Sequence, residues 1–343
     1  MSKPSDQKTE VIVVTGATAG VGRAVVEEFA RHHAKIGLLA RDETRLQQTV
    51  DAVKKLGGEA IAIPTDVADA NAVEEAASKV EDAYGPIDIW INNAMTTVFA
   101  SLKDIEPDEY RRATEVTYLG AVWGTMAALR RMRERDRGVI VQVGSALSYR
   151  AIPLQAPYCG AKFAIRGMTD SLRCELMHEN SSIHITMVQL PAVNTPQFGW
   201  CRSKLPNHPQ PVPPIFTSQM AADAIYWAAH QRRREVQLGL PTMQAIEGNK
   251  VAPSLADWKL ANSAIDGQQT NEPIDANRPD NLFSPVPGDF DANGIFDDRA
   301  KDRRWQWLIT KRHRWVLAAL VLVAVALIVL LTLGVQAAIE STT

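Results

Sequence analysis

The hydrophobic residues of this chain fall into short, regularly spaced runs between residues 11 and 240. Seven of these runs are rich in β-branched residues and apolar at almost every position, which is typical of strands covered on both faces. We expect strands over Val11–Thr15, Ile36–Ala40, Ala60–Pro64, Ile87–Ile91, Gly138–Val143, Ile183–Leu190 and Glu235–Leu238.

Segments of helical periodicity connect the strands. Apolar residues recur there at intervals of three and four positions. These segments include Gly22–His32, Glu43–Leu56, Ala70–Tyr84, Asp108–Arg135 and Ala156–His178. The repeated alternation of strand and helix predicts an α/β fold, a doubly wound parallel sheet of the Rossmann type with about seven strands.

The pattern changes beyond residue 240. Residues 241–300 contain six prolines and one segment of helical character, which Ser254 opens after Pro253. Asn271–Asp298 has seven acidic residues against one arginine, so we expect it to be extended and partly draped over the domain. The chain thus divides into a polar tail over residues 1–10, one domain over residues 11–240 and a linker over residues 241–314.

The last apolar run is of a different kind. No residue from Trp315 to Ile339 is charged. In a helix these residues would span about 38 Å, more than the roughly 30 Å of bilayer hydrocarbon, and this favours a transmembrane helix over a buried core helix. Basic residues precede the run and only residues 340–343 follow it. The positive-inside rule therefore predicts a single-pass C-terminal anchor in the lipid bilayer, with the large N-terminal domain on the cytoplasmic side.

Charge and composition narrow the function classes. The net charge is −2, with 37 Lys and Arg against 39 Asp and Glu, and this argues against a nucleic-acid-binding protein. The three cysteines and seven histidines have no ligand spacing, so we expect no metal site. Asp289–Asp297 matches the first nine positions of a calcium-binding loop, but Ala300 occupies the position of the bidentate glutamate, which favours a plain acidic turn.

A glycine-rich turn joins the first strand to the first helix. Glycines allow positive φ and the close approach of a pyrophosphate, to which a helix N-terminus offers free N–H groups. Any tight strand–helix turn can use a glycine, but this position favours a dinucleotide site. The candidate cofactor-binding residues are Thr15, Gly16, Gly20, Val21 and Gly22.

Arginines rather than a carboxylate follow the second strand. NAD(H) sites usually have an acidic residue here, which binds the ribose 2′-hydroxyl. Arg41 and Arg45 would instead pair with a 2′-phosphate, although Asp42 offsets part of their charge. This favours NADP(H) over NAD(H), with a solvated loop arginine as the alternative interpretation of Arg41.

Ser145 and Tyr158-x-x-x-Lys162 form a candidate catalytic set. Tyr158 and Lys162 are four residues apart and share one face of a helix. A nearby ammonium lowers the pKa of a tyrosine from its ordinary value of about 10 and makes it a usable acid or base. Ser145, at the end of a strand, would donate a hydrogen bond to a substrate oxygen. A Tyr–Lys pair alone is common on helix surfaces, so the interpretation of these residues as a catalytic site depends largely on Ser145.

Taken together, these motifs resemble those of the short-chain dehydrogenase/reductase family, in order over residues 11–240. Further matches are Asp66-Val67, Asn92-Asn93-Ala94 and Pro191-x-Val193-x-Thr195. The resemblance implies that Tyr158 is the acid/base, that Ser145 orients the substrate, and that both sites lie in one domain. It implies a homodimer or homotetramer as well. The cofactor contacts it implies are Asp66 and Val67 at the adenine, Asn93 at the adenosine ribose, Lys162 at the nicotinamide ribose, and Val193 and Thr195 at the carboxamide.

Three positions depart from the family pattern. Met95 and Ala192 replace glycines, and Thr117 replaces the asparagine of the proton relay. Threonine offers one hydroxyl where asparagine offers a carbonyl and two N–H donors. The relay would then run through a water held by Thr117 or by a backbone carbonyl.

The sequence therefore predicts a membrane-anchored, NADP(H)-dependent oxidoreductase that interconverts a carbonyl and an alcohol on a small, lipophilic substrate. Two alternatives stay open: a non-catalytic module that senses NADP(H) at the membrane, and an NAD(H)-dependent alcohol dehydrogenase. An apolar substrate pocket is expected from Leu147, Tyr149, Ile152, Phe198 and Trp200.

Overall fold

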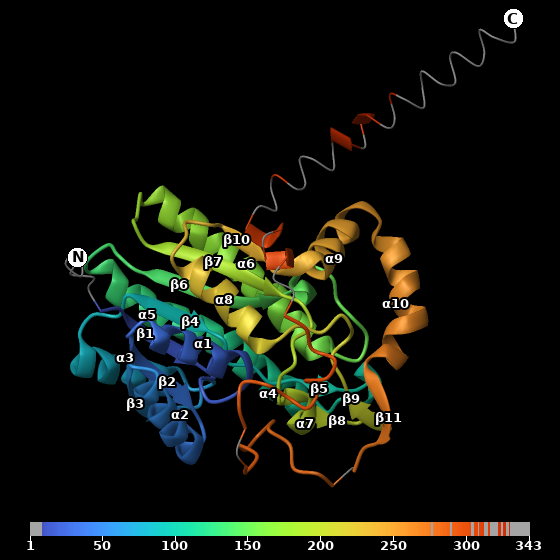
Figure 1. Ribbon diagram of the computed structural model, residues 1–343, viewed down its shortest axis with the longest axis horizontal. Coiled ribbons are helices and arrows are strands. Elements are labelled where there is room, and N and C mark those ends of the chain that lie inside the picture. Colours follow the sequence, from blue (N-terminus) through green and yellow to red (C-terminus); the bar gives the residue numbers. More distant parts are fainter. Residues whose placement is uncertain are drawn as a thin grey trace, which may run out of the picture.

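A seven-stranded parallel sheet forms the centre of the fold, with the strand order β10-β7-β6-β4-β1-β2-β3 (Figure 1). This confirms the predicted doubly wound α/β fold. The computed structural model describes residues 9–275, 277–288, 290–302, 305–307, 309–311, 315, 322–323, 325–326 and 329. The strands of the sheet are β1 (Val11–Thr15), β2 (Lys35–Ala40), β3 (Glu59–Pro64), β4 (Ile89–Asn92), β6 (Val139–Ser145), β7 (His184–Leu190) and β10 (Glu235–Gln237).

Helices cover both faces of this sheet, and alternate residues of β1 reach different sides. Ile12 and Val14 pack in a core with α1 (Gly20–Arg31), α2 (Glu43–Lys55) and α8 (Ser218–Ala229). Val11 and Val13 belong to the opposite core. That core contains residues of α3 (Ala70–Tyr84), α5 (Gly120–Arg133) and α6 (Ala156–His178). Burial on both sides explains why the strand sequences are apolar throughout.

The single helix expected over Asp108–Arg135 is interrupted. It consists of α4 (Pro107–Thr114), a π-helical turn over Glu115–Leu119, and α5. Thr117, inside the π-helical turn, donates a hydrogen bond to the carbonyl of Thr96 (2.8 Å) and accepts one from its N–H (3.0 Å). These contacts join the widened turn to the loop after β4.

Two helices follow residue 238, where the sequence indicated one. The expected helix is α10 (Pro253–Gly267), and α9 (Gly239–Val251) precedes it. Its glycines and Pro241 conceal α9 in the sequence, but a proline in the first turn removes no intrahelical hydrogen bond. Two short sheets complete this side. They pair β5 (Val98–Phe99) with β8 (Arg202–Ser203) and β9 (Asn207–Pro209) with β11 (Gln269–Pro273).

The predicted anchor over residues 315–339 falls almost entirely outside the described residues, as do residues 1–8 of the N-terminal tail. Within the described part of the chain, no helix combines the length and the apolar character needed to cross a membrane.

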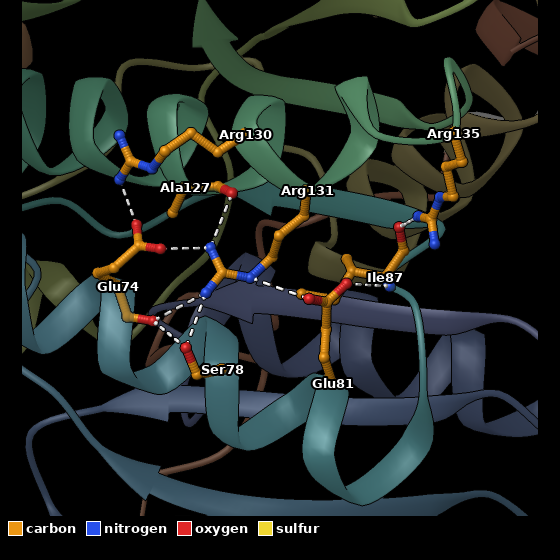
Figure 2. Close-up of polar contacts among 8 residues, drawn as sticks. All are labelled: Glu74, Ser78, Glu81, Ile87, Ala127, Arg130, Arg131 and Arg135. Atoms are coloured by element: carbon orange, nitrogen blue, oxygen red, sulfur yellow. Dashed lines mark hydrogen bonds and ion pairs between the residues drawn. The ribbon is translucent and has the colours of Figure 1, made fainter.

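Arginines at the end of α5 connect this helix to α3 (Figure 2). The Arg131 side chain is 11% exposed and contacts Glu74 (2.6 Å), Ser78 (2.8 Å) and Glu81 (3.1 Å). Arg130 also pairs with Glu74, but its side chain is 54% exposed. The partly buried guanidinium of Arg131 therefore makes most of the polar contacts between the two helices.

Replacing Arg131 with methionine should lower the free energy of unfolding by about 2 kcal/mol, because three charge-assisted contacts are lost at a shielded position. Arg130→Met is the matched control and should cost less than about 0.5 kcal/mol, as is usual for exposed ion pairs. Urea unfolding measures both values. Equal losses in the two variants would contradict the assignment to Arg131.

Candidate active site

The loops at the carboxyl edge of the sheet enclose one cavity of about 460 Å³. Loops at this edge come together because all seven strands point the same way, which is where doubly wound sheets bind ligands. Most of the site residues predicted from the sequence line this cavity. They are Gly16, Gly20, Val21, Arg41, Arg45, Asp66, Val67, Asn93, Ser145, Tyr158, Lys162, Val193 and Thr195.

Thr15 and Gly22 do not line the cavity but shape the turn that does. The Thr15 hydroxyl accepts hydrogen bonds from the N–H groups of Asn93 (3.0 Å) and Ala94 (3.1 Å). A Cβ on Gly22 would lie 2.0 Å from the carbonyl oxygen of Gly16, so only glycine fits there. Gly16 has a φ of +67°, in the region that favours glycine. Thr15 and Gly22 thus hold the backbone of the turn in place.

Asn93 connects the glycine turn to β4. Its side-chain amide donates to the carbonyl oxygens of Thr15 (3.0 Å) and Gly16 (3.1 Å). The resemblance implied a ribose contact for this residue. In the structure its amide is already used to brace the turn, while another part of Asn93 borders the cavity.

Two arginines line the cavity beyond the end of β2. Arg45 is 7% exposed and pairs with Asp42 (3.2 Å). Its Nε is buried and has no hydrogen-bond partner among the described residues. Arg41 directs its two terminal nitrogens at the carbonyl oxygens of Asn281 (2.6 Å) and Phe283 (3.0 Å). A buried, unpaired guanidinium N–H is costly, and this donor set therefore fits an anionic ligand group.

Asp66 has a charged partner that the sequence did not indicate. Burial raises the pKa of this carboxyl group, but hydrogen bonds from Arg112 and from the N–H of Ala68 outweigh it, and the pKa lies below its ordinary value. Asp66 is therefore an ionised acceptor beside the cavity. Arg112 lies 46 residues further along the chain, on α4, and no local motif connects the two.

Lys162 and Tyr158 lie together on α6. The Lys162 Nζ is 5.4 Å from the centre of the Tyr158 ring and donates to the carbonyl oxygen of Val143 (2.6 Å). Lys162 is 3% exposed, and burial lowers its pKa from 10.5 to about 8. At neutral pH it remains mostly an ammonium.

Tyr158 differs from the expectation of a lowered pKa. Burial raises the pKa of its phenol above 10, and a hydrogen bond with the Ser145 side chain counters this only in part. The reason is that desolvation penalises the phenolate more than its surroundings stabilise it. Tyr158 is therefore protonated at neutral pH. Ser145 also accepts a hydrogen bond from the N–H of Leu147 (3.1 Å), which orients its hydroxyl.

Thr117 already uses its hydroxyl in both directions, toward the carbonyl and the N–H of Thr96. It is fully buried. These contacts use its one O–H donor and one of its two acceptor lone pairs, so a relay water could interact with this hydroxyl only as a donor to the second lone pair.

The substrate end of the cavity is apolar. Leu147, Ile152 and Phe198 line the cavity as expected, and so does Trp200, whose ring lies 5.2 Å from the guanidinium of Arg45. Tyr149 does not line it, and its hydroxyl donates to Glu235 (2.8 Å). Several lining residues have no local sequence signal because loops and helices distant in the chain bring them in. They include Gln155, Gln210, Pro211, Val212, Pro213, Pro214, Pro241, Thr242, Ala245, Leu260, Asn281 and Pro285.

The described residues contain no group of three or more His, Cys, Asp or Glu placed to hold a metal ion. Asp289, the first residue of the candidate calcium loop, lies outside the described residues. Asp297, at the end of that loop, accepts a hydrogen bond from the side chain of Asn194 (2.8 Å). This contact supports the interpretation of the loop as an acidic turn packed on the domain.

Comparisons with known proteins agree on one family for this chain. Residues 10–204 match the short chain dehydrogenase family. The uncharacterized oxidoreductase YxnA of Bacillus subtilis is 28% identical over 302 residues, 87% of this chain and 82% of that protein. The 3-dehydrosphinganine reductase of Danio rerio is 33% identical over 201 residues, 57% of this chain but only 60% of the reductase.

Among solved structures, the alcohol dehydrogenase of the archaeon Thermococcus sibiricus complexed with 5-hydroxy-NADP is similar, with a TM-score of 0.59 and 25% identity. The match covers 67% of this chain and 96% of that one. The family match spans more than half of the chain, and the motifs and fold agree with it. The protein therefore belongs to the short-chain dehydrogenase family and is an oxidoreductase of that family.

Proposed function

We propose that the protein interconverts a carbonyl and an alcohol (CH–OH/C=O), with NADP(H) as the hydride carrier and Tyr158 as the acid/base. One observation carries this proposal. Ser145, Tyr158 and Lys162 line the same cavity as Arg41 and Arg45, so a single bound dinucleotide can reach both groups. The Thermococcus sibiricus relative was solved with 5-hydroxy-NADP, which supports a nicotinamide cofactor.

In the reducing direction each catalytic residue has a definite role. When bound, NADP(H) supplies or accepts the hydride. Ser145 donates a hydrogen bond to the substrate oxygen, and Tyr158, protonated at neutral pH because of its raised pKa, transfers its proton to that oxygen. Lys162 then stabilises the resulting phenolate, since it still carries most of its charge at neutral pH.

The preference for NADP(H) rests on Arg41 and Arg45. No carboxylate occupies the position after β2 that would select a ribose 2′-hydroxyl. Instead the buried, unpartnered Nε of Arg45 and the guanidinium of Arg41 provide donors for a phosphate. Asp42 partly neutralises Arg45, and a bound 2′-phosphate would share that arginine with it.

The substrate class and the location are proposed from apolar surfaces. The prolines of residues 211–214 and residues of α9 and α10 make the substrate end of the cavity apolar, which suits a lipophilic alcohol or ketone. The uncharged run from Trp315 to Ile339 supports a single-pass anchor, with the catalytic domain on the cytoplasmic side. We also propose pairing of two or four copies through α5 and α6, where Met126 and Phe163 are exposed.

Tyr158→Phe should reduce turnover of NADPH with a carbonyl substrate by at least about 10³-fold, because the variant has no proton to transfer. NADPH binding, followed by tryptophan fluorescence, should stay within about threefold, since the phenol is not needed to hold the nucleotide. Tyr149→Phe is the matched control, because that hydroxyl contacts Glu235 outside the cavity, and it should keep its activity. Retained turnover in the Tyr158 variant would sink the assignment. NADPH binding without turnover by the wild type would favour a sensor.

Arg41→Ala should raise the Kd for NADPH about tenfold or more and change the Kd for NADH little, because only NADPH has the 2′-phosphate. Arg31→Ala, on the exposed side of α1, is the control for a general loss of positive charge. Titration of both variants with both nucleotides measures the ratio of the two Kd values. An unchanged ratio would point to an NAD(H)-dependent dehydrogenase.

Deletion of residues 315–343 should move the protein from the membrane pellet to the supernatant, because the uncharged run is then absent. Deletion of residues 340–343 alone is the control and should leave it in the pellet. Fractionation with carbonate extraction measures both. A protein that stays membrane-bound without residues 315–343 would disprove the anchor.

A further inference from the structure

One segment from near the C-terminal end of the described chain lies against the cofactor motifs from its beginning. This segment, the strap, comprises residues 277–288 and 290–301. In Figure 1 it is the orange chain that leaves β11 and passes along the lower edge of the molecule, near α4 and α7 (Gln197–Trp200). Its contacts with Arg41 span 240 and 242 residues of the chain, and its contact with Gly20 of the glycine turn spans still more, so no local motif predicts them.

The first end of the strap is firmly anchored. Leu282 is fully buried in a small core with Val98 and Ala113. The N–H of Asn281 donates to the carbonyl oxygen of Trp200 (2.9 Å). Arg112 donates from its Nε to the carbonyl oxygen of Leu282 (3.1 Å), which connects this end to α4.

The second end is anchored as well. Phe296 is 6% exposed and packs with Phe99 and Phe198. Asn194 accepts a hydrogen bond from the N–H of Phe296 (3.1 Å) and donates to Asp297 (2.8 Å). Both ends are therefore parts of the folded domain, and the middle of the strap is held between them.

The strap makes hydrogen bonds with two of the groups proposed to bind the phosphates of the cofactor. Arg41 donates to the carbonyl oxygens of Asn281 and Phe283. The N–H of Gly20, in the first turn of α1, donates to the carbonyl oxygen of Asp291 (3.1 Å). Asn281 and Pro285 line the cavity. The strap thus forms one wall of the cofactor cavity.

An aromatic contact holds the middle of the strap down. The ring of Phe290 lies edge-on against Trp200, with 4.4 Å between ring centres. The guanidinium of Arg45 lies 5.2 Å from the Trp200 ring and 5.4 Å from the Phe290 ring. Cation–π contacts of this kind contribute modestly to stability. Val286, also in the middle, is 7% exposed. The middle is therefore held by this buried side chain and by the contacts of Phe290, between two buried ends.

We propose that the strap belongs to the cofactor site and that its middle, residues 283–288 and 290–291, closes over the bound dinucleotide and slows its release. The proposal rests on the proposed NADP(H) cofactor. The cavity persists beneath the strap, so the strap is a wall rather than a plug. The polar contacts of the middle with Arg41 and Gly20 are made by the backbone carbonyls of Phe283 and Asp291. Asn281, in the anchored first end, makes its own contact with Arg41.

Phe290→Ala tests this directly. The variant should release NADPH about tenfold faster than the wild type, equivalent to about 1.4 kcal/mol, because the ring that holds the middle of the strap is gone. Ile295→Ala is the matched control, since Ile295 lies on the same strap but is 77% exposed, and its release rate should be unchanged. Stopped-flow displacement of NADPH by excess NADP⁺ measures the rates, with far-UV circular dichroism to verify folding.

Hydrogen exchange of the wild-type protein gives a second readout that needs no variant. Saturating NADP⁺ should slow amide exchange in residues 283–291, while exchange in α3, of which no residue lines the cavity, stays the same. Equal release rates in Phe290→Ala and wild type, or no protection of residues 283–291, would overturn the proposal for the strap alone. Slower release in the variant would show that the strap competes with the cofactor, and would also overturn it. A wild type that binds no NADPH would refute both the strap and the proposed cofactor.

Discussion

The hydrogen bonds between Thr15 and Asn93 hold together the two strand ends on which the site depends. They bind the glycine turn after β1 to the end of β4, and Asn93 binds the carbonyls of Thr15 and Gly16 in return. With the turn fixed, α1 begins at Gly20 with its N-terminus toward the cavity. Arg41 and Asp66 reach the same cavity because β2 and β3 follow β1 in parallel register. The positions of the candidate cofactor-binding residues thus depend on these hydrogen bonds and on the parallel register of the strands.

The proton chemistry depends on burial in a different way. Lys162 is almost fully buried, and a buried ammonium costs stability that a neutral residue would not. The same burial keeps the proton on Tyr158 and lowers the pKa of Lys162 to about 8. At neutral pH the phenol therefore keeps the proton that it is proposed to transfer, and only Lys162 is held near its change of charge. This is an example of stability given up for function.

Local pattern predicted much of this molecule, and long-range packing determined the rest. The seven strands, the glycine turn and the Ser145–Tyr158–Lys162 set were readable because each depends on neighbours in sequence. Arg112 and Asn281 were not, since only the folded chain brings them to Asp66 and Arg41. The sequence also did not indicate which aromatic side chains face the cavity. Tyr149 and Phe198 have similar aromatic character, yet only Phe198 faces the cavity. The π-helical turn around Thr117 likewise makes a contact with Thr96, 21 residues earlier, that no local pattern indicates.

The distance along the chain between the strap and the glycine turn has a consequence for biosynthesis. A ribosome releases the chain from its N-terminus, and domains generally begin to fold as they emerge. The sheet can form once residue 237, the end of β10, is available. Arg41, however, meets its two carbonyl partners only when residues 281 and 283 have been made. During synthesis, the part of the cavity at the edge of the sheet can therefore form before the strap that covers it has been made.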